Sequence, residues 1–514
     1  MIRIGIDVGG TNTDAVLLDG PTLLHASKTP TTADVTAGIR AALRETLAAT
    51  NIPPARIAAV MIGTTHFTNA VIQRRDLARI AAIRIGLPAT ATLPPFIDWP
   101  PDLRAIVKGP IALLRGGHEV DGRPLVPFDQ AAMRETAQSL TSANIPAAAI
   151  TAVFSPLNAE AEHQAAAILA EHAPNLAITL SHELGRIGLL ARENVALLNA
   201  ALTPLARRTV AAFRAALAQS GIAAPLYITP NDGTVATADE AATHPVRSFA
   251  SGPTNSLRGA AFLSNLANAM VADIGGTTTD VGSLVQGFPR EANNVVHIGG
   301  VRTLFRMPDL VSVGLGGGTL VNPSNPQDIG PNSVGYRLPE RARIFGGPDL
   351  TCTDIAVAAG LITLGNPALV ATLAPSFVAQ ALARIHAIIA DAVDRMRADA
   401  TPRPLIAVGG AAFLIPNTLP GISHIVCVPN QGVANALGAA IAQVSGEIDQ
   451  VFQNLPRDEA LAQARHLATQ RAIRAGANPT TITLVDQEDI PIAYLPGNSL
   501  RIRARVVGDV GEGK

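Results

Sequence analysis

The chain has 514 residues, and its 39 Lys and Arg nearly balance its 40 Asp and Glu, which leaves a formal net charge of −1. This balance excludes the broad basic surface typical of nucleic-acid binding and the acidic tail of a solvating segment, so we expect no nucleic-acid partner. Hydrophobic residues make up 48% of the chain. At ~100–200 residues per domain, about two to four domains with large cores are predicted.

Helices and strands are predicted to alternate along the chain. An apolar run at 2–6 predicts a strand, helical spacing of apolar residues over 34–50 predicts a helix, and 57–62 predicts a second strand. The later predictions are helices near 129–143, 159–172 and 192–219, and strands near 78–86, 150–154, 176–180, 225–229 and 424–429. Residues 404–412 predict a buried strand that runs into a Gly-Gly turn. Such alternation is typical of α/β layers with mainly parallel or mixed sheets.

One short segment occurs twice in the chain. Residues 7–14 read DVGGTNTD and residues 273–280 read DIGGTTTD, so six of the eight positions are identical. Each copy follows one apolar run and precedes another, a pattern that predicts a β-hairpin with a Gly-Gly turn. A duplicated hairpin indicates two related α/β domains that face each other across a cleft.

The two turns carry the groups that bind phosphate. Glycines let backbone N–H groups approach an anion, and the alternate hydroxyls of Thr11 and Thr13 project to one side. Asp7 and Asp273 end the incoming strands and could hold a divalent metal, directly or through water. The candidate phosphate-binding residues are Gly9, Gly10, Thr11, Asn12, Thr13, Gly275, Gly276, Thr277 and Thr278.

A cluster of polar residues follows the strand predicted at 57–62. Residues 63–69 read GTTHFTN and open a predicted helix, whose N-terminus attracts anions or carbonyl oxygens. Capping accounts for one threonine but not for the whole cluster, so a substrate-side role and a structural role are equally favoured. The candidate substrate residues are Thr64, Thr65, His66 and Asn69.

Two further glycine-rich loops lie in the second half of the chain. Residues 313–319 read VGLGGGT, without the strand and helix of a dinucleotide-binding unit around them, and 408–412 read VGGAA. Beside the repeated hairpins both loops become candidates to border a nucleotide, although a packing turn is the alternative at 408–412. The candidate residues are Gly316, Gly317, Gly409 and Gly410. The P-loop pattern is absent, so any ATP chemistry here would not be of that class.

The composition changes near residue 448. A polar helix at 457–475 precedes alternating β-type segments, which predict a small C-terminal appendage. Arg501, Arg503 and Arg505 share one face of the last predicted strand, and a solvated face is the favoured interpretation.

The cysteine content and the apolar runs bear on the compartment. Cys352 and Cys427 are too few for a disulfide framework or a cysteine-based zinc site, and two free thiols are the favoured interpretation. Because no run of about 18 uninterrupted apolar residues occurs, we expect no transmembrane helix and no membrane partner. The sequence thus predicts a cytoplasmic protein.

The order of these motifs resembles the hydantoinase/oxoprolinase family, specifically its hydantoinase A-type (ATP-binding) subunit. The resemblance covers roughly residues 1–445. The motifs that carry it are DVGGTNTDAVLLD at 7–19, GTTHFTNAVIQRR at 63–75, SHELGRIGLLARENVALLNAALTPL at 181–205, TPNDGTV at 229–235, PVRSFASGPTNS at 245–256, ADIGGTTTDVGSL at 272–284, VGLGGGT at 313–319, GGPDLTCTDIAVAAG at 346–360 and AVGGAA at 407–412.

The resemblance implies an actin/sugar-kinase/Hsp70-like (ribonuclease H-like) fold, in which duplicated α/β domains surround a nucleotide cleft. It also implies ATP and Mg²⁺ as cofactors and the ATP-dependent opening of a cyclic amide such as a hydantoin or 5-oxoproline. By position, Asp7 and Asp273 would be catalytic and would hold the metal. The expected domains are 1–180 with the first phosphate hairpin, 181–447 with the second hairpin and the adenosine loop, and 448–514 as the appendage.

Several alternatives remain open at this point. The chain is shorter than many A-type members, and Phe67 stands where a smaller residue is expected, which bears on the substrate. The resemblance implies a B-type partner subunit, and a homo-oligomer is left open. Other functions of the same core are an ATP-dependent carboxylase subunit, a small-molecule kinase with Asp280, Asp309 or Asp354 as base, and an ATP-driven switch or reactivating chaperone.

Overall fold

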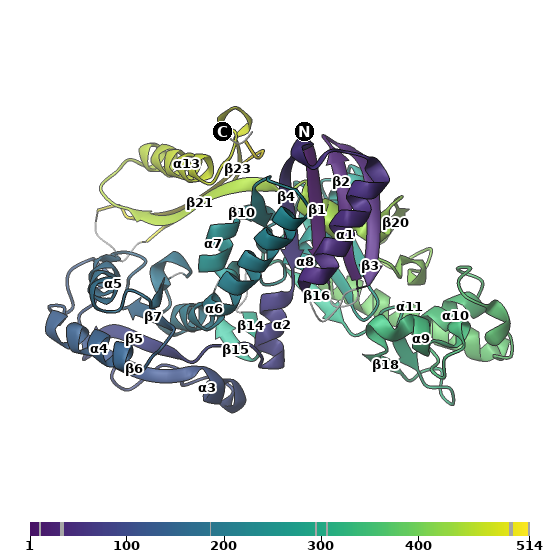
Figure 1. The fold of residues 1–514 in the computed structure, drawn as a ribbon, viewed down its shortest axis with the longest axis horizontal. Helices are drawn as coiled ribbons and strands as arrows, with labels where there is room; N and C mark the ends of the chain where they lie inside the picture. The colour runs from purple at the N-terminus through teal and green to yellow at the C-terminus, as the bar shows by residue number, and fades with distance from the viewer. Residues whose placement is uncertain are drawn as a thin grey trace.

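Two core sheets meet in the middle of the molecule, and an inserted module extends from each of them (Figure 1). The structure is a computed structural model that describes residues 1–9, 12–30, 35–185, 187–292, 296–304, 307–492 and 497–511.

Nine strands form the first core sheet: β1 (Ile2–Val8), β2 (Asn12–Asp19), β3 (Thr22–Pro30), β4 (Ile57–Thr64), β9 (Leu226–Ile228), β10 (Thr234–Thr237), β21 (Gln443–Phe452), β22 (Thr483–Pro491) and β23 (Leu500–Gly508). Their spatial order is β22-β23-β21-β10-β9-β4-β1-β2-β3. β1 pairs antiparallel with β2 and parallel with β4. Helices cover both faces of the sheet, so β1 is buried almost throughout and forms a near-continuous apolar run.

The second core sheet repeats this arrangement. Its strands are β11 (Ala269–Ile274), β12 (Thr279–Val285), β13 (Phe288–Pro289), β16 (Leu310–Val313), β19 (Arg403–Val408) and β20 (Ile422–Cys427). The order is β13-β12-β11-β19-β20, with β16 paired to β12, and β11 is antiparallel to β12 and parallel to β19. Both sheets therefore place an antiparallel hairpin beside parallel strands, which confirms the predicted duplication and the actin/sugar-kinase/Hsp70-like fold class.

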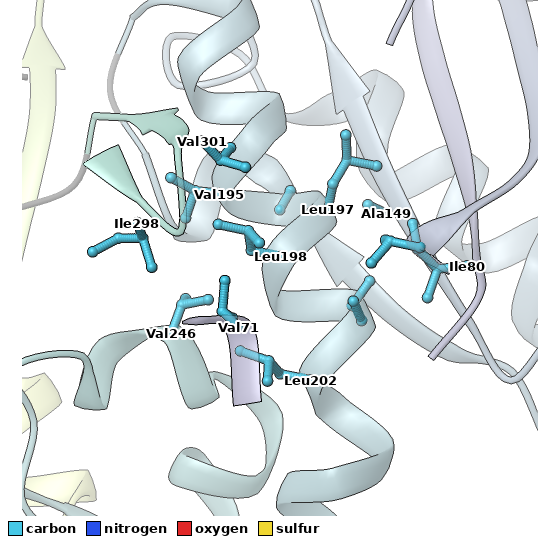
Figure 2. Packing of buried hydrophobic residues seen from close by; sticks show 14 of the residues in the cluster. Val71, Ile80, Ala149, Val195, Leu197, Leu198, Leu202, Val246, Ile298 and Val301 are labelled. Atoms are coloured by element: carbon cyan, nitrogen blue, oxygen red, sulfur yellow. The ribbon is translucent and has the colours of Figure 1, made fainter. Parts of the chain in front are cut away.

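A four-stranded parallel sheet is inserted after β4. It contains β5 (Ile80–Leu87), β6 (Lys108–Arg115), β7 (Ala147–Ala152) and β8 (Ala177–Leu180), accompanied by α2 (His66–Gln73), α3 (Pro101–Val107), α4 (Gln130–Ser142) and α5 (Glu160–His172). The 31-residue α6 (Leu189–Gln219) returns the chain to the first core sheet. Figure 2 shows Val195, Leu198 and Leu202 of α6 gathered with Val71 and Val246 in one buried cluster, which fixes the module against the core.

A second inserted module lies between β12 and β19. It contains β17 (Thr319–Val321), β18 (Ile329–Ser333), α9 (Leu338–Arg341), α10 (Cys352–Ala358) and α11 (Pro375–Met396), whereas the hairpin of β14 (Val296–Ile298) and β15 (Val301–Thr303) packs on α6 and α2 of the first module. Among the described residues, α11 is the one helix long and apolar enough to cross a membrane, a test that buried core helices also pass. Its residues Ile385 and Ile389 are fully buried in the core cluster of the second sheet. Cys352 and Cys427 are both free thiols, as the sequence predicted.

The helices α8 (Ser251–Ser264) and α12 (Ala434–Ala440) cross between the two core sheets. α12 packs on β1, β2 and β4 of the first sheet, and α8 packs on β11, β12 and β19 of the second. The outer face of the first sheet is covered by α1 (Val35–Thr50) and α6, with α7 (Ala238–Thr243) beside β9 and β10.

The C-terminal segment adds to the first core sheet. Its strands β22 and β23 pair with each other, β23 pairs with β21, and α13 (Arg457–Arg474) packs on β21 and β23. Arg503 and Arg505 are buried, so the interpretation of a solvated arginine face was wrong. Their guanidinium groups instead contact Glu291, which follows β13 of the second sheet, at 2.8 and 3.3 Å. The domain boundaries at 180 and 447 stay a prediction.

Candidate active site

The two repeated hairpins end in equivalent tight turns. In the first, the Gly9 N–H donates to the Asn12 carbonyl over 3.0 Å, and in the second the Gly275 N–H donates to the Thr278 carbonyl over 2.9 Å. The predicted hairpins are thus confirmed, with Val8 opposite Thr13 in the first copy. Gly10 and Thr11 lie outside the described residues.

Asp7 lies in a buried position next to the last residue of β1. It lies opposite Asp14 on β2 and opposite Gly63 on β4, and its side chain is almost inaccessible to solvent. Asn435 Nδ2 donates to Asp7 Oδ2 over 2.9 Å. Asp7 Oδ1 is buried and accepts no hydrogen bond of ordinary geometry among the described residues, although the nearby Asn255 amide favours its charged form. Asp7 therefore keeps one acceptor unfilled.

The pKa of Asp7 is raised from its usual 3.8 to about 7. Burial is the largest cause, because it removes water from the charged carboxylate, and repulsion from Asp14 and Asp273 adds to it. The hydrogen bond from Asn435 opposes this rise. A carboxyl with a pKa near neutrality can either carry a proton or hold a cation, and perturbed groups of this kind cluster at functional sites.

Asp273 takes the corresponding place at the end of β11. Burial raises its pKa, while a hydrogen bond from Ser256 and the charge of Lys28 oppose the rise. Gly409 packs directly against it, since a Cβ there would lie 2.4 Å from Asp273 Oδ1. The structure thus brings the 408–412 loop to the second aspartate.

Two more carboxylates, Asp14 and Asp280, complete an acidic cluster around the hairpins. Each lies opposite the first aspartate of its own repeat, on β2 and β12. Lys28 Nζ lies 3.1 Å from both oxygens of Asp14 and offsets part of its burial. Burial and repulsion from Asp273 raise the pKa of Asp280 to about 6, although Ser312 donates a hydrogen bond to it. The sequence analysis named Asp280 only as a candidate base of a kinase and did not single out Asp14, although both residues end the repeated octets.

The two glycine-rich loops lie against the second turn. Gly317 and Gly318 donate their N–H groups to the carbonyls of Gly275 and Gly276, over 3.0 and 2.8 Å. A Cβ on Gly316 would lie 2.6 Å from the Gly275 carbonyl oxygen, so this close approach requires glycine.

The 408–412 loop reaches the same place. Ala411 N–H donates to the Ile274 carbonyl over 2.8 Å, and an added Cβ on Gly410 would meet no atom within 4 Å. The structure therefore gathers the predicted glycines Gly275, Gly276, Gly316, Gly317, Gly409 and Gly410 around the end of β11.

The polar cluster at 63–69 begins beside Asp7. Thr64 is buried at the end of β4, and its Oγ1 accepts the His66 N–H over 3.1 Å. Asn69 Nδ2 donates to Thr65 Oγ1 over 3.2 Å. Burial lowers the pKa of His66, so a neutral imidazole is favoured at the start of α2. A substrate-side role for this cluster stays a prediction.

The acidic cluster around the hairpins could hold a metal ion through one or two of its carboxylates. Among the described residues, no group of three or more His, Cys, Asp and Glu side chains converges as a metal site. Mg²⁺ nevertheless binds commonly through one or two carboxylates together with waters and phosphate oxygens. The unfilled Oδ1 of Asp7 and the raised pKa values of four neighbouring carboxyls fit such a cation.

Sequence reasoning missed Asn435, Asn255 and Lys28. Asn435 and Lys28 are 428 and 14 residues from the carboxylates that they contact. Nothing in their immediate sequence indicates a role at Asp7 or Asp14. A surface hollow of ≈ 470 Å³ near Arg56 and Pro225 lies at the opposite, amino ends of β1 and β4, away from this chemistry.

Comparison with curated proteins gives distant relatives that are enzyme subunits. The chain is 26% identical over 400 residues to the caprolactamase subunit alpha of Pseudomonas jessenii, which covers 71% of this chain and 55% of that protein. It is 28% identical over 399 residues to the acetophenone carboxylase gamma subunit of Aromatoleum aromaticum, covering 70% and 53%. The chain thus spans about half the length of the curated relatives it matches.

Solved structures share the whole fold. The nucleotide-free structure of acetone carboxylase superposes with a TM-score of 0.70 at 18% identity, over 100% of this chain and 88% of that one. The ATP-dependent caprolactamase from Pseudomonas jessenii superposes with a TM-score of 0.78 at 18% identity, over 98% and 87%. At this identity the likeness establishes the fold.

Family models match two successive parts of the chain. Residues 3–173 match the hydantoinase/oxoprolinase N-terminal region, and residues 192–368 match the hydantoinase/oxoprolinase model. Together the two matched regions cover more than half of the sequence and include both repeated hairpins. The chain therefore belongs to the hydantoinase/oxoprolinase family.

Proposed function

We propose that this chain is the ATP-binding subunit of an enzyme that opens a cyclic amide, such as a hydantoin or 5-oxoproline, by phosphorylating the ring carbonyl oxygen. The observation that carries the proposal is the pair of equivalent turns, each preceded by an aspartate whose pKa is raised because the carboxyl is removed from water. Two such turns suit the two sides of a polyphosphate, because their N–H and O–H groups donate to anionic oxygens. The similarity to a caprolactamase subunit supports the substrate class.

In the proposed placement, the turns at 9–13 and 275–278 hold the phosphates. Gly316, Gly317, Gly409 and Gly410 border the nucleotide, and the open space beside Gly410 leaves room for a flat base or ribose. Asp7 and Asp273 hold Mg²⁺, directly or through water, which would neutralise the charge that develops on the transferred phosphoryl group. The polar cluster Thr64, Thr65, His66 and Asn69 follows Gly63, which lies opposite Asp7, and would face the amide.

The proposed reaction conserves atoms and charge in three steps. The amide oxygen attacks the γ-phosphorus, the bond to the bridging oxygen breaks, and ADP leaves. Water then adds to the activated ring carbon and the C–N bond breaks, which releases the amine and leaves an acyl phosphate. A second water hydrolyses the acyl phosphate to a carboxylate and phosphate. Asp7 would act either as a ligand of the cation or as the base that accepts a proton from the attacking water, and not as both at once.

An ATP-dependent carboxylase subunit is the second candidate. It is supported by the similarity to the acetophenone carboxylase gamma subunit. In that case ATP would activate a ketone or bicarbonate instead of a ring amide, through the same phosphate turns. Both relatives are named as subunits, so we propose a partner subunit of the hydantoinase B type for either function.

Phosphate release from Mg²⁺-ATP tests the proposal. The purified chain, alone and with a B-type subunit, would be assayed against hydantoins, 5-oxoproline and other lactams, and against ketones with bicarbonate. We expect one lactam to stimulate release with matching ring-opened product. Stimulation by ketone and bicarbonate alone would favour the carboxylase.

Two aspartate variants and a control accompany the assay. Asp7→Asn and Asp273→Asn should abolish the stimulated rate, whereas Asp19→Asn, on the same hairpin but paired with the amino terminus, should retain it. Unchanged Mg²⁺-ATP turnover in both Asp7→Asn and Asp273→Asn would contradict the assignment of the turns.

A further inference from the structure

The crossing of α8 and α12 is unusually close. A Cβ on Gly259 of α8 would lie 1.8 Å from the Ala434 carbonyl oxygen, and a Cβ on Gly438 of α12 would lie 1.8 Å from the Asn255 carbonyl oxygen. Each helix thus presents a glycine where the other's backbone touches it. The relative position of the two helices is therefore set by direct backbone contact.

Polar side chains reach from this crossing to Asp7. Asn435 Nδ2 donates to Asp7 Oδ2 over 2.9 Å, while its own Oδ1 accepts the Ala436 N–H over 2.8 Å, which fixes the orientation of the amide. Asn255 Nδ2 donates to Thr229 Oγ1 over 2.9 Å and lies beside the other oxygen of Asp7. Asp7 is thus hydrogen-bonded from α12 and approached by a side chain of α8.

The same crossing also reaches the second aspartate. Ser256 follows Asn255 on α8, and its side chain lies close enough to Asp273 to favour the charged form of that carboxyl. Adjacent residues of one helix therefore approach the aspartates of both repeats. Displacement of α8 against α12 would shift Asp7 relative to Asp273.

We propose that Asn435 is a positioning residue. Together with Asn255 it fixes the position of the Asp7 carboxylate relative to Asp273, so that both aspartates can bind one metal–nucleotide complex. This inference rests on the proposed ATP site. Asn435 acts through Asp7 and touches no reacting atom. Its amide supplies the donor that replaces lost water on one carboxylate oxygen and leaves the other side of the group for the cation.

The test separates positioning from folding with two substitutions. Asn435→Ala removes the amide, and Asn435→Asp keeps its shape and its bond to the Ala436 N–H but removes the donor to Asp7. Asn199→Ala is the matched control, because Asn199 is also fully buried but donates to Thr179 Oγ1 and the Thr243 carbonyl instead of to an aspartate.

Calorimetry of ATP binding with Mg²⁺ and with EDTA is the first readout, and kcat and KM for Mg²⁺-ATP hydrolysis are the second. Mg²⁺ should raise the ATP affinity of the wild-type chain above its affinity in EDTA. For both Asn435 variants we expect this increase in affinity, and kcat for Mg²⁺-ATP, to fall by about tenfold or more. ATP affinity in EDTA should not change. Asn199→Ala should lower the melting temperature but leave the effect of Mg²⁺ on ATP affinity, and kcat, unchanged.

Two results would overturn the inference in different ways. Wild-type binding of Mg²⁺-ATP together with unchanged metal dependence in both Asn435 variants would overturn the positioning role alone. Failure of the wild-type chain to bind Mg²⁺-ATP would overturn the proposed function, and this inference with it.

Discussion

Asp7 and Gly63 face each other on the parallel strands β1 and β4, and a Cβ on Gly63 would lie 2.6 Å from Asp7 Oδ1 and 2.4 Å from Asn255 Nδ2. The absence of a side chain at position 63 is therefore what allows the carboxylate and the amide to meet. Gly63 is the first residue of the GTTHFTN motif, so this motif serves the aspartate site through its glycine as well as through its hydroxyls.

Gly63→Ala is expected to impair the site. The extra methyl group must displace Asp7 or Asn255, and overpacking of this kind costs about 1–3 kcal/mol of folding free energy. We expect a lower melting temperature and at least about a tenfold loss in Mg²⁺-ATP turnover, because small displacements of positioned groups are costly. Gly432→Ala is the control, since a Cβ there meets nothing within 4 Å. Equal behaviour of the two variants would contradict the role of Gly63.

Asp7→Asn is expected to stabilise the fold at alkaline pH while it removes activity. Burial raises the pKa of Asp7 to about 7, so the folded state disfavours its charged form. Below about pH 4 the carboxyl is protonated in both folded and unfolded chains, and the variant gains nothing. The gain should grow between pH 4 and 7 and stay constant above. Melting curves at pH 4, 6 and 8 without metal check this, and a gain largest at pH 4 would refute it.

Lys28 is expected to be coupled energetically to Asp14. Lys28→Met leaves the buried Asp14 carboxylate without its neighbour at 3.1 Å, so the melting temperature should fall. Asp14→Asn removes the carboxylate charge that Lys28→Met leaves without a partner. The double variant should therefore recover much of the lost stability. A double-mutant cycle in denaturant measures the coupling, for which we expect about 0.5–3 kcal/mol. Additive effects of the two substitutions would exclude the coupling.

His244 is expected to make stability depend on pH. It lies 3.0 Å from Glu240 and 3.1 Å from Glu183 of the inserted module. Burial disfavours the charged imidazole, but the hydrogen bonds to the two glutamates outweigh it and raise the pKa of His244 above its usual 6.5. The stabilisation is complete below pH 6.5 and is lost as the pH rises through the folded pKa.

His244→Gln should therefore lower the melting temperature more at pH 6 than at pH 9. His386→Gln provides a control of opposite sign, because burial lowers the pKa of His386 and the folded state disfavours its protonation. The same loss at both pH values in His244→Gln would show that the imidazole contributes only as a neutral group.

Local patterns predicted the elements well. The helix predicted at 159–172 is α5 (Glu160–His172), and the strand predicted at 57–62 is β4 (Ile57–Thr64). The spacing of apolar residues depends on which face of a helix or strand is buried. It can therefore be detected within a short stretch of consecutive residues. The repeated octets likewise predicted both hairpins, because a tight turn and its flanking strands are local in sequence.

Contacts between distant segments could not be predicted in this way. Arg503 sits on an alternating strand that looks solvated, yet it is buried, because β23 pairs with β21 and meets Glu291 of the second sheet. A local sequence pattern does not show which strand pairs with which. It also does not distinguish an exposed arginine from one that is buried and ion-paired.

The sequence by itself determined the duplicated hairpins, the glycines of their turns and the two leading aspartates, since each of these is specified within about ten residues. Only the tertiary structure decided what surrounds the aspartates. Asn435 meets Asp7 across 428 residues because α8 and α12 cross at Gly259 and Gly438 with their backbones in contact. The electrostatics of a buried carboxylate depend on every charge and donor within a few ångströms, and those neighbours are set by packing.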